Sequence, residues 1–496
     1  LLTGLVLDGG TFESSGTGSI TKDTGGIAKI SNVTNNGQLN IWGKGGSIEL
    51  GGTLVNNGTL SINSDNNVFN AHLRTSVDVA IGGDGVVQMT TPSDRLDAQI
   101  FTDTAVMLTI GENQTVMGSG RFGGDNDGII ENLGVINGNH AAAGKEPAFE
   151  LLLEGNHTGN NLGVYRSDNG LLTLGNGLAL DHGTFDSSGD GIVDVANNSS
   201  ASVSDVTNLG HLGIRGNGSF LRMAGPVVNN GTLSVNSNAN IFNAHLVFET
   251  ASAELIGNGT VRMQISSDFN DAQIFTNGAF DGLIGSGQFV GGSGQIDGRN
   301  GGTIVNTGVI DGDDPINELR LYGNHDGSGG GIYQSTGGVL GMTSGVVMNG
   351  GTFETSAGGS VAMVTTGVAL LSDMVNNGTM DLRGAGGIVE IDSPLTNNGT
   401  ININSDANIF NAHIRFQADT VIDGVGNITM VTNNNSNDAQ IIAASGFTGT
   451  IGSGQSVSGD GLLVGNINLN GVLDPGGTTR TMNIDALTLS ASSELI

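Results

Sequence analysis

The sequence predicts an all-β chain that winds into a parallel β-helix, or β-solenoid, with rungs of about 21 residues. Three observations carry this prediction. The chain is a nearly threefold internal repeat, Asn-Gly corners recur inside each copy, and the composition suits a narrow aliphatic interior. Of 496 residues, 86 are glycine and only 4% are aromatic, whereas 37% are hydrophobic. Such a chain is too apolar to be disordered and too poor in aromatics for a large globular core.

The repeat has a period of roughly 170 residues. The phrase Gly-Thr-Phe occurs at Phe12, Phe185 and Phe353, and the offsets are 185 − 12 = 173 and 353 − 185 = 168. We therefore expect three solenoid copies, 1–170, 171–338 and 339–496, which form one continuous rod. The third copy diverges from the others after about residue 470.

A shorter period lies inside each copy. Gly37 and Gly58 each follow an Asn, their offset is 58 − 37 = 21, and the pattern recurs in the other copies. Strict alternation follows each corner, as in Thr-Ile-Asn-Ile-Asn-Ser, which indicates a strand with Ile401 and Ile403 on one face. Equivalent asparagines one rung apart should stack as amide ladders along the axis. The predicted ladder residues are Asn35, Asn56, Asn376 and Asn397.

The rung after each corner pair is longer and contains a recurring phrase. From Gly58 to Gly85 the offset is 85 − 58 = 27, and the excess holds Asn-Val-Phe-Asn-Ala-His or a close variant in every copy. An Asp-Ala-Gln follows its histidine about one long rung later, at offsets of 97 − 72 = 25, 271 − 245 = 26 and 438 − 413 = 25. We expect each histidine to bridge to the Asp or Gln of the next turn as a structural brace, with the phenylalanine of the phrase plugging the side of the coil. The brace residues are His72 with Asp97, His245 with Asp271, and His413 with Asp438, and the plugs are Phe69, Phe242 and Phe410.

A histidine beside an aspartate is also compatible with metal binding or acid–base catalysis. A zinc site needs three or four ligands, and only one His and one Asp recur here. No nucleophile or basic neighbour recurs with them. The brace is therefore the preferred interpretation, and no catalytic residue is assigned.

Acidic turns offer candidate calcium ligands, since calcium prefers oxygen donors. These are Asp125, Asp127, Asp311, Asp313 and Asp314. Solvated turn carboxylates are the simpler interpretation, and no other cofactor is expected.

The net charge of −31 disfavours binding to nucleic acid and to anionic membrane surfaces, because both would repel the chain. It suits a saline setting, where ions screen self-repulsion. No apolar run is long enough to span a bilayer.

The segment from Ile451 to Gly477, followed by the strand-like Thr481 to Leu495, resembles the end region of passenger domains in bacterial autotransporters and large adhesion exoproteins. The shared features are a Gly-Ser-Gly corner, a Gly-Asp-Gly corner and a Leu-Asp-Pro-Gly turn before alternating leucines. The resemblance implies a right-handed β-helix, export, and a place on a bacterial cell surface. It carries no catalytic residues to transfer.

The expected function is that of a non-enzymatic extracellular rod, stalk or filament subunit. Neither Leu1 nor Ile496 lies in a polar cap, so we expect the solenoid to associate with itself, end to end or laterally. The alternative is an adhesin that binds a surface glycan or protein through lateral loops, and exposure of the three phenylalanines would favour it. The third hypothesis is a polysaccharide-active enzyme, which needs carboxylates on adjacent rungs of a groove.

Overall fold

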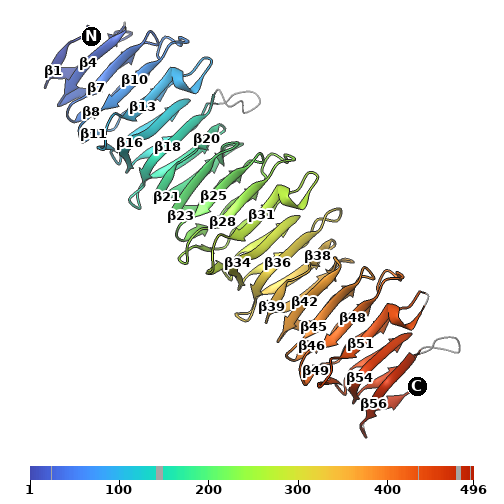
Figure 1. The fold of residues 1–496 in the computed structure, drawn as a ribbon. Helices are drawn as coiled ribbons and strands as arrows, with labels where there is room; N and C mark the ends of the chain where they lie inside the picture. The colour runs from blue at the N-terminus through green and yellow to red at the C-terminus, as the bar shows by residue number, and fades with distance from the viewer. Residues whose placement is uncertain (24, 141–148, 434, 476–481, 492) are drawn as a thin grey trace. The chain divides into compact units, whose positions relative to one another are not determined.

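The computed structural model describes residues 1–23, 25–140, 149–433, 435–475, 482–491 and 493–496. These residues form 57 strands joined by short turns, without an α-helix among them. The pairings are parallel, and each strand pairs with the strand about one turn away (Figure 1). The predicted all-β parallel solenoid is therefore confirmed.

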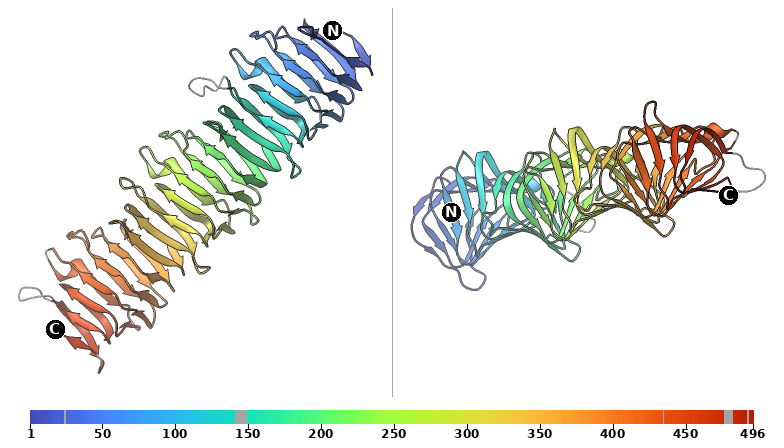
Figure 2. Two further views of the ribbon diagram at one scale, coloured as in Figure 1. Left: turned by 180° about the vertical axis from the view of Figure 1, so that it is seen from behind. Right: turned by 90° about the horizontal axis from the view of Figure 1, so that it is seen from below.

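Contacts between residues divide the chain into two units. Unit 1 comprises 1–238 and 244–246, and unit 2 comprises 239–243 and 247–496. The division falls inside the second sequence copy, and β28 (Ala244–Phe248) contains residues of both units. In each unit, successive turns of strands lie next to one another (Figure 2).

Unit 1 contains three stacks of strands, which the chain visits in turn. Stack A is β1 (Val6–Asp8), β4 (Gly26–Ser31), β7 (Gly46–Leu50), β10 (Ala71–Thr75), β13 (Ala98–Thr102), the first parts of β16 (Gly120–Asn132) and β18 (Leu151–Thr158), β20 (Leu171–Leu174), β22 (Ile192–Val195), β24 (His211–Ile214) and β27 (Thr232–Val235).

Stack B is β2 (Thr11–Phe12), β5 (Val33–Asn35), β8 (Leu54–Asn56), β11 (Val79–Gly82), β14 (Met107–Ile110), the second parts of β16 and β18, the first parts of β21 (Ala179–Ser188) and β23 (Ser200–Asn208), and β25 (Ser219–Met223). Stack C is β3 (Ile20–Lys22), β6 (Gln38–Ile41), β9 (Thr59–Ile62), β12 (Val86–Met89), β15 (Thr115–Gly118), β17 (Val135–Asn137), β19 (Val164–Asp168), the second parts of β21 and β23, and β26 (Val227–Asn229).

Unit 2 has three stacks of the same kind. Stack D is β30 (Thr260–Met263), β33 (Phe289–Gly292), β35 (Val309–Asp311), β37 (Ile332–Thr336), β40 (Thr352–Ser356), β43 (Val375–Asn376), β46 (Leu395–Asn397), β49 (Thr420–Asp423), β52 (Thr448–Ile451), and the second parts of β54 (Gly461–Leu469) and β56 (Met482–Leu489).

Stack E is β31 (Ala272–Thr276), the first parts of β34 (Gly294–Asn306) and β36 (Leu319–Asp326), β38 (Val339–Met342), β41 (Ser360–Met363), β44 (Thr379–Leu382), β47 (Thr400–Ile403), β50 (Asn427–Met430), β53 (Ser456–Gly459), β55 (Val472–Asp474) and β57 (Glu494–Leu495). Stack F is β29 (Glu254–Ile256), β32 (Asp281–Ile284), the second parts of β34 and β36, β39 (Val347–Asn349), β42 (Gly367–Ser372), β45 (Gly387–Ile391), β48 (Ala412–Phe416), β51 (Ala439–Ala443) and the first parts of β54 and β56.

The interior is aliphatic because the strands alternate. In β47, Ile401 and Ile403 are fully buried, whereas Thr400 and Asn402 on the other face are half-buried. Parallel strands place like residues above like residues, so Ile401 pairs in register with Ile428 of β50. Each turn thus adds a layer of branched side chains, and burial of their area is the main stabilising term.

Glycines at the corners allow adjacent turns to approach closely. Gly58 lies directly over Gly37, and a Cβ on Gly58 would overlap the backbone of Gly37. Gly399 lies over Gly378 in the same way. The Asn-Gly corners therefore recur because no larger residue fits between the stacked backbones.

The buried amide ladder runs through these corners. Asn35 Nδ2 donates to Asn56 Oδ1 at 2.8 Å, and Asn376 Nδ2 donates to Asn397 Oδ1 at 2.7 Å. A glutamine two turns further on, unpredicted from sequence, continues each ladder. Gln455 Nε2 donates to the Asn397 carbonyl at 2.7 Å, and Asn397 Nδ2 donates to Gln455 Oε1 at 2.9 Å. Gln114 makes the same pair of bonds with Asn56.

Two tyrosines belong to the core. Tyr165 and Tyr333 are fully buried, and each contacts a buried histidine, His157 or His325. Each histidine places Nε2 at 3.1 Å from the carbonyl of the third residue before it. Burial lowers the pKa of both histidines to about 4, so both rings are neutral near pH 7.

No helix among the described residues is long and apolar enough to cross a membrane.

Candidate binding loops

Three equivalent loops leave the coil at the long rungs. They span 63–70, 236–243 and 404–411, and we call them the exposed loops. Each begins with an asparagine whose φ is positive: Asn63 at 59°, Asn236 at 64° and Asn404 at 60°. Asparagine tolerates this left-handed conformation better than most residues, which explains its recurrence at the point where the chain turns outward.

The same asparagine closes the loop on itself. Asn63 Nδ2 donates to the Asn67 carbonyl at 2.9 Å, and the Asn67 amide donates to Asn63 Oδ1 at 3.0 Å. Asn404 and Asn408 form the same two bonds, both at 3.0 Å. Two bonds to a fully buried side chain give the loop a fixed shape.

A second anchor ties each loop to the preceding turn. The Gly43 amide donates to Asp65 Oδ1 at 2.6 Å, and the Gly384 amide donates to Asp406 Oδ1 at 2.6 Å. In the middle copy, the Gly216 amide donates to Asn238 Oδ1 at 2.8 Å. The loops are therefore braced by their own Asn and Asp side chains.

The loop phenylalanines point outward, so the predicted side plugs are wrong. Phe69, Phe242 and Phe410 are 64%, 54% and 60% exposed. The aliphatic residue before each is also exposed: Val68 at 58%, Ile241 at 57% and Ile409 at 53%. The strand residues already fill the narrow interior, so a loop outside the coil has no core to enter. An exposed aliphatic–aromatic pair therefore recurs at the same position of all three loops.

A shallow pocket lies beside two of these phenylalanines. The first, of 570 Å³, is lined by Lys44, Gly45, Asn67, Phe69 and Asn70. The second, of 480 Å³, is lined by Thr366, Ala385, Gly386, Ile409, Phe410 and Asn411. The offset from Lys44 to Ala385 is 385 − 44 = 341, and that from Phe69 to Phe410 is 410 − 69 = 341. The two pockets are thus the same feature in the first and third copies.

Two of the histidines behind the loops lie in register with a glutamine of the next turn. His72 pairs in register with Gln99, and Gln99 Nε2 lies 3.2 Å from His72 Nε2. His413 pairs in register with Gln440. Burial, and then the nearby Arg74 or Arg415, lowers the pKa of His72 and of His413. Neutral rings of this kind are packing and hydrogen-bonding groups at pH 7.

The predicted partners Asp97, Asp271 and Asp438 have another role. Each is buried at the end of a short 3-10 turn, η1 (Arg95–Asp97), η3 (Phe269–Asp271) or η4 (Ser436–Asp438). Asp97 Oδ2 accepts from the Asp94 amide at 2.9 Å, and Asp271 Oδ2 accepts from the Ser267 amide at 2.8 Å. The expected bridge from His245 to Asp271 would join residues of different units, and it stays a prediction. The expected bridge to the next turn therefore occurs at His72, where the partner is Gln99 rather than Asp97, whereas His413 only lies in register with Gln440. Asp97 and Asp438 cap separate turns.

The candidate calcium ligands do not form a common site. Asp125 pairs with Arg121, and Asp313 pairs with Arg262 at 2.5 Å. Asp311 accepts from Gln334 Nε2 and the Thr336 hydroxyl, both at 2.7 Å. Asp314 caps the turn at Ile316, and Asp127 lines a separate groove. The grouping of metal-ligating atoms found within the described part of the chain includes none of these five.

That grouping is Asp181, His182 and Asp205, which sequence reasoning missed. His182 Nδ1 lies 2.9 Å from Asp181 Oδ2 on the surface. A departure from the repeat could have pointed to this grouping. His182, with φ of 60°, occupies the position where the other copies have Gly9 and Gly350.

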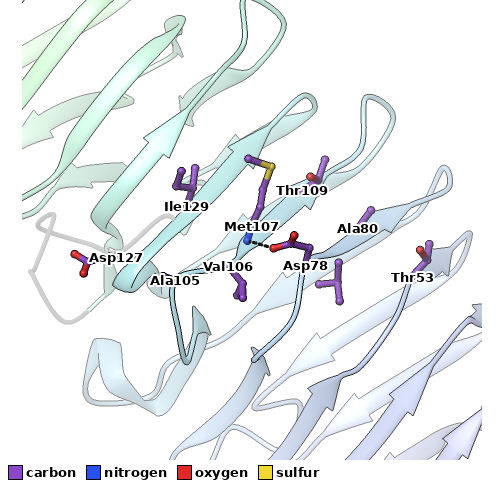
Figure 3. A pocket seen from close by; sticks show the side chains of 10 residues that line it. Thr53, Asp78, Ala80, Ala105, Val106, Met107, Thr109, Asp127 and Ile129 are labelled. Carbon is purple, nitrogen blue, oxygen red and sulfur yellow. Dashed lines mark hydrogen bonds between the residues drawn. The ribbon is translucent and has the colours of Figure 1, made fainter.

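The enzyme hypothesis requires paired carboxylates in a groove, and a groove in unit 1 contains two carboxylates. This groove has a volume of 480 Å³ and includes Asp78 and Asp127 in its lining. Asp78 already accepts from the Met107 amide at 2.9 Å, and Val106 and Ala105 separate it from Asp127 (Figure 3). The equivalent groove of the third copy contains Asp392 and Asp419, and Asn468 stands at the position of Asp127, so the same pair of carboxylates does not recur.

No protein-family model matches the chain, and a comparison with curated proteins gives no significant match.

Proposed function

We propose that this chain is a non-enzymatic adhesive scaffold: a β-solenoid that displays a repeated, pre-shaped loop for binding. The observation that carries the proposal is the exposure of the same aliphatic–aromatic pair in all three copies. Single exposed apolar side chains are common, but an exposed apolar cluster that recurs at equivalent positions marks a candidate interaction site. Aromatic residues are also among those most enriched at the centres of protein interfaces.

The hydrogen bonds that anchor the exposed loops support a role in binding rather than a role as flexible linkers. A loop whose shape is fixed by buried Asn63 or Asn404 loses little conformational entropy when it meets a ligand. The stacked strands beneath it provide a rigid base, as binding loops on other scaffolds require.

We further propose that the chain acts outside the cell, on a bacterial surface, in accord with its resemblance to autotransporter passengers and adhesion exoproteins. The net charge of −31 keeps such chains soluble and apart, and it suits a saline medium.

Cell binding tests this function. The triple variant Phe69→Ala, Phe242→Ala and Phe410→Ala should keep the β-sheet circular-dichroism spectrum of the parent, because the three rings are outside the core. It should lose most of the binding of labelled protein to cell surfaces. Undiminished binding by the folded variant would refute the role of the loops.

A second candidate function is a structural rod or filament subunit, either end to end or lateral. The observation in its favour is the ladder of buried amides and stacked strands within each unit, which stiffens the coil along its axis. Electron microscopy with and without a chelator, together with light scattering, distinguishes filaments from separate molecules.

A further inference from the structure

The exposed loops do not return to the same strand stack in successive copies. In unit 1, the loop 63–70 leaves from β9 of stack C and leads to β10 of stack A. The next loop begins after β27, which belongs to stack A. A sequence copy is therefore not a whole number of turns.

Unit 2 gives the size of the remainder. The second strand after loop 236–243 is β29, and it lies in stack F. The first strand after loop 404–411 is β48, and it also lies in stack F. Seven pairing steps connect β29 to β48 along the stack. One copy thus spans seven turns and one additional strand, or about seven and a third turns of a three-stranded coil.

The twist of the strand stacks offsets this additional third of a turn. The segments before β31 and β51 carry η3 and η4, and they belong to different stacks, E and F. Figure 1 nevertheless shows both projecting from the same edge of unit 2. A third of a circle over seven and a third turns is about 16° per turn, within the usual twist between neighbouring strands. Within unit 2, the extra strand therefore returns the two equivalent loops to one side.

The exposed loops lie one turn before these segments along the chain, so 239–243 and 404–411 share that edge of unit 2. At about 4.8 Å per turn, they are about 35 Å apart along the stacks. Their spacing suits a ligand that is itself extended and repetitive, because one molecule can then contact both loops.

The chemistry of the pocket in unit 2 indicates the class of ligand. The pocket of the third copy combines the ring of Phe410 with the Asn411 amide, the Thr366 hydroxyl and the backbone of Gly386, and its lining is uncharged. An apolar ring beside amides and a hydroxyl matches a sugar, which has one apolar face and a rim of hydroxyl groups. The volume is within the range of small-ligand sites. A chain of net charge −31 would repel an anionic polymer, whereas a neutral polymer meets no such repulsion.

We propose that the exposed loops bind a neutral polysaccharide, which runs along one edge of unit 2 and engages the loops of successive copies together. This inference rests on the proposed adhesive function and specifies its ligand. Two weak sites joined on one rigid support bind a polymer much more tightly than either site alone, provided that the polymer spans them.

The test uses the full chain in native gels that contain soluble neutral polysaccharides, here a β-glucan, a galactomannan and starch, with anionic alginate as a comparison. The parent should be retarded by at least one neutral polymer and not by alginate. Phe242→Ala or Phe410→Ala should each weaken retardation at least tenfold, and the double variant should abolish it. Ile316→Ala is the matched control, because Ile316 is 87% exposed and lies outside the loops.

Fragment length supplies the second readout. Six-sugar fragments of the retarding polymer should bind at least a hundredfold more weakly than the polymer, because they are too short to join two loops. Equal affinity for fragment and polymer would overturn the two-loop geometry. Loop-dependent cell binding that survives complete deglycosylation of the cells, without retardation by any neutral polymer, would overturn the polysaccharide ligand but leave the adhesive function intact. Cell binding that is unaffected by the loop variants would refute both.

Discussion

Gln99 Nε2 lies 3.2 Å from His72 Nε2, one turn along the coil, and also donates to the Leu96 carbonyl at 2.8 Å. The glutamine, rather than the histidine, therefore connects the strand β13 to the turn η1. The bond from glutamine to the turn recurs at Gln440, which donates to the Asn437 carbonyl at 2.8 Å and lies in register with His413.

This relationship predicts unequal costs for the two partners. Gln440→Ala should lower the free energy of unfolding by about 1–2 kcal/mol, because it removes the hydrogen bond to the Asn437 carbonyl and leaves that carbonyl without its donor. His413→Ala should cost less than Gln440→Ala, since its ring is only partly buried. Chemical denaturation of both variants measures the difference. A larger loss for His413→Ala would restore the histidine as the main brace.

The amide ladder predicts a large effect at one asparagine and a small one at its neighbour. Asn397→Leu should destabilise the chain by about 2–3 kcal/mol, because Asn376 and Gln455 would then keep buried polar atoms without their partner. Asn398 is exposed, and its side chain donates to Asn377 Oδ1 at 3.1 Å in an outer ladder. Asn398→Leu should change stability by less than about 0.5 kcal/mol. Similar melting temperatures for the two variants would contradict the importance of the buried ladder.

Backbone strain in the exposed loop predicts a stabilising substitution. Ala407 has φ of 49°, whereas its equivalent in the first copy is Asn66 with φ of 52°. A left-handed conformation costs an ordinary residue about 1–2 kcal/mol, and asparagine adopts it at a lower cost. Ala407→Asn should therefore stabilise the chain by about 0.5 kcal/mol, and Asn66→Ala should destabilise it by a similar amount. Hydrogen exchange in the two loops should move in opposite directions.

The buried histidines predict a loss of stability in acid. The pKa of His157 and of His325 is lowered by burial to about 4, below the unfolded value of about 6.5. Below pH 6.5 the unfolded chain binds protons that the folded chain does not, so stability falls as pH falls and levels off near pH 4. Each histidine accounts for about 3 kcal/mol of this decline.

The measurement is the melting temperature of the parent and of the double variant His157→Gln and His325→Gln between pH 7.5 and 4.5. The variant is expected to melt lower than the parent at pH 7.5 but to lose less stability on acidification, so the two curves converge. Parallel curves would show that the histidines do not titrate as their burial requires.

The sequence by itself predicted the coil, because its information is periodic. Alternation in Thr400 to Ile403, Asn-Gly corners one rung apart and a long unit that recurs almost three times are all local or repetitive signals, and each has a direct structural meaning in parallel stacking. The Asn35–Asn56 and Asn376–Asn397 bonds follow from that stacking alone. The continuation of the ladders to Gln114 and Gln455 also had a signal, since each glutamine follows its asparagine at the same offset of 58.

Only the tertiary structure decided which side chains of the long rung face water. Phe69 and Phe410 belong to loops without an alternating pattern, so the sequence does not indicate whether their side chains face the core or the solvent. They are exposed because the strand residues already fill the interior. Sequence spacing could not distinguish Asp97 from Gln99 as the partner of His72, because the 3-10 turn just before Gln99 sets the exact register. The return of equivalent loops to one edge of unit 2 depends on strand twist accumulated over seven turns, and that is a property of the stack rather than of any segment.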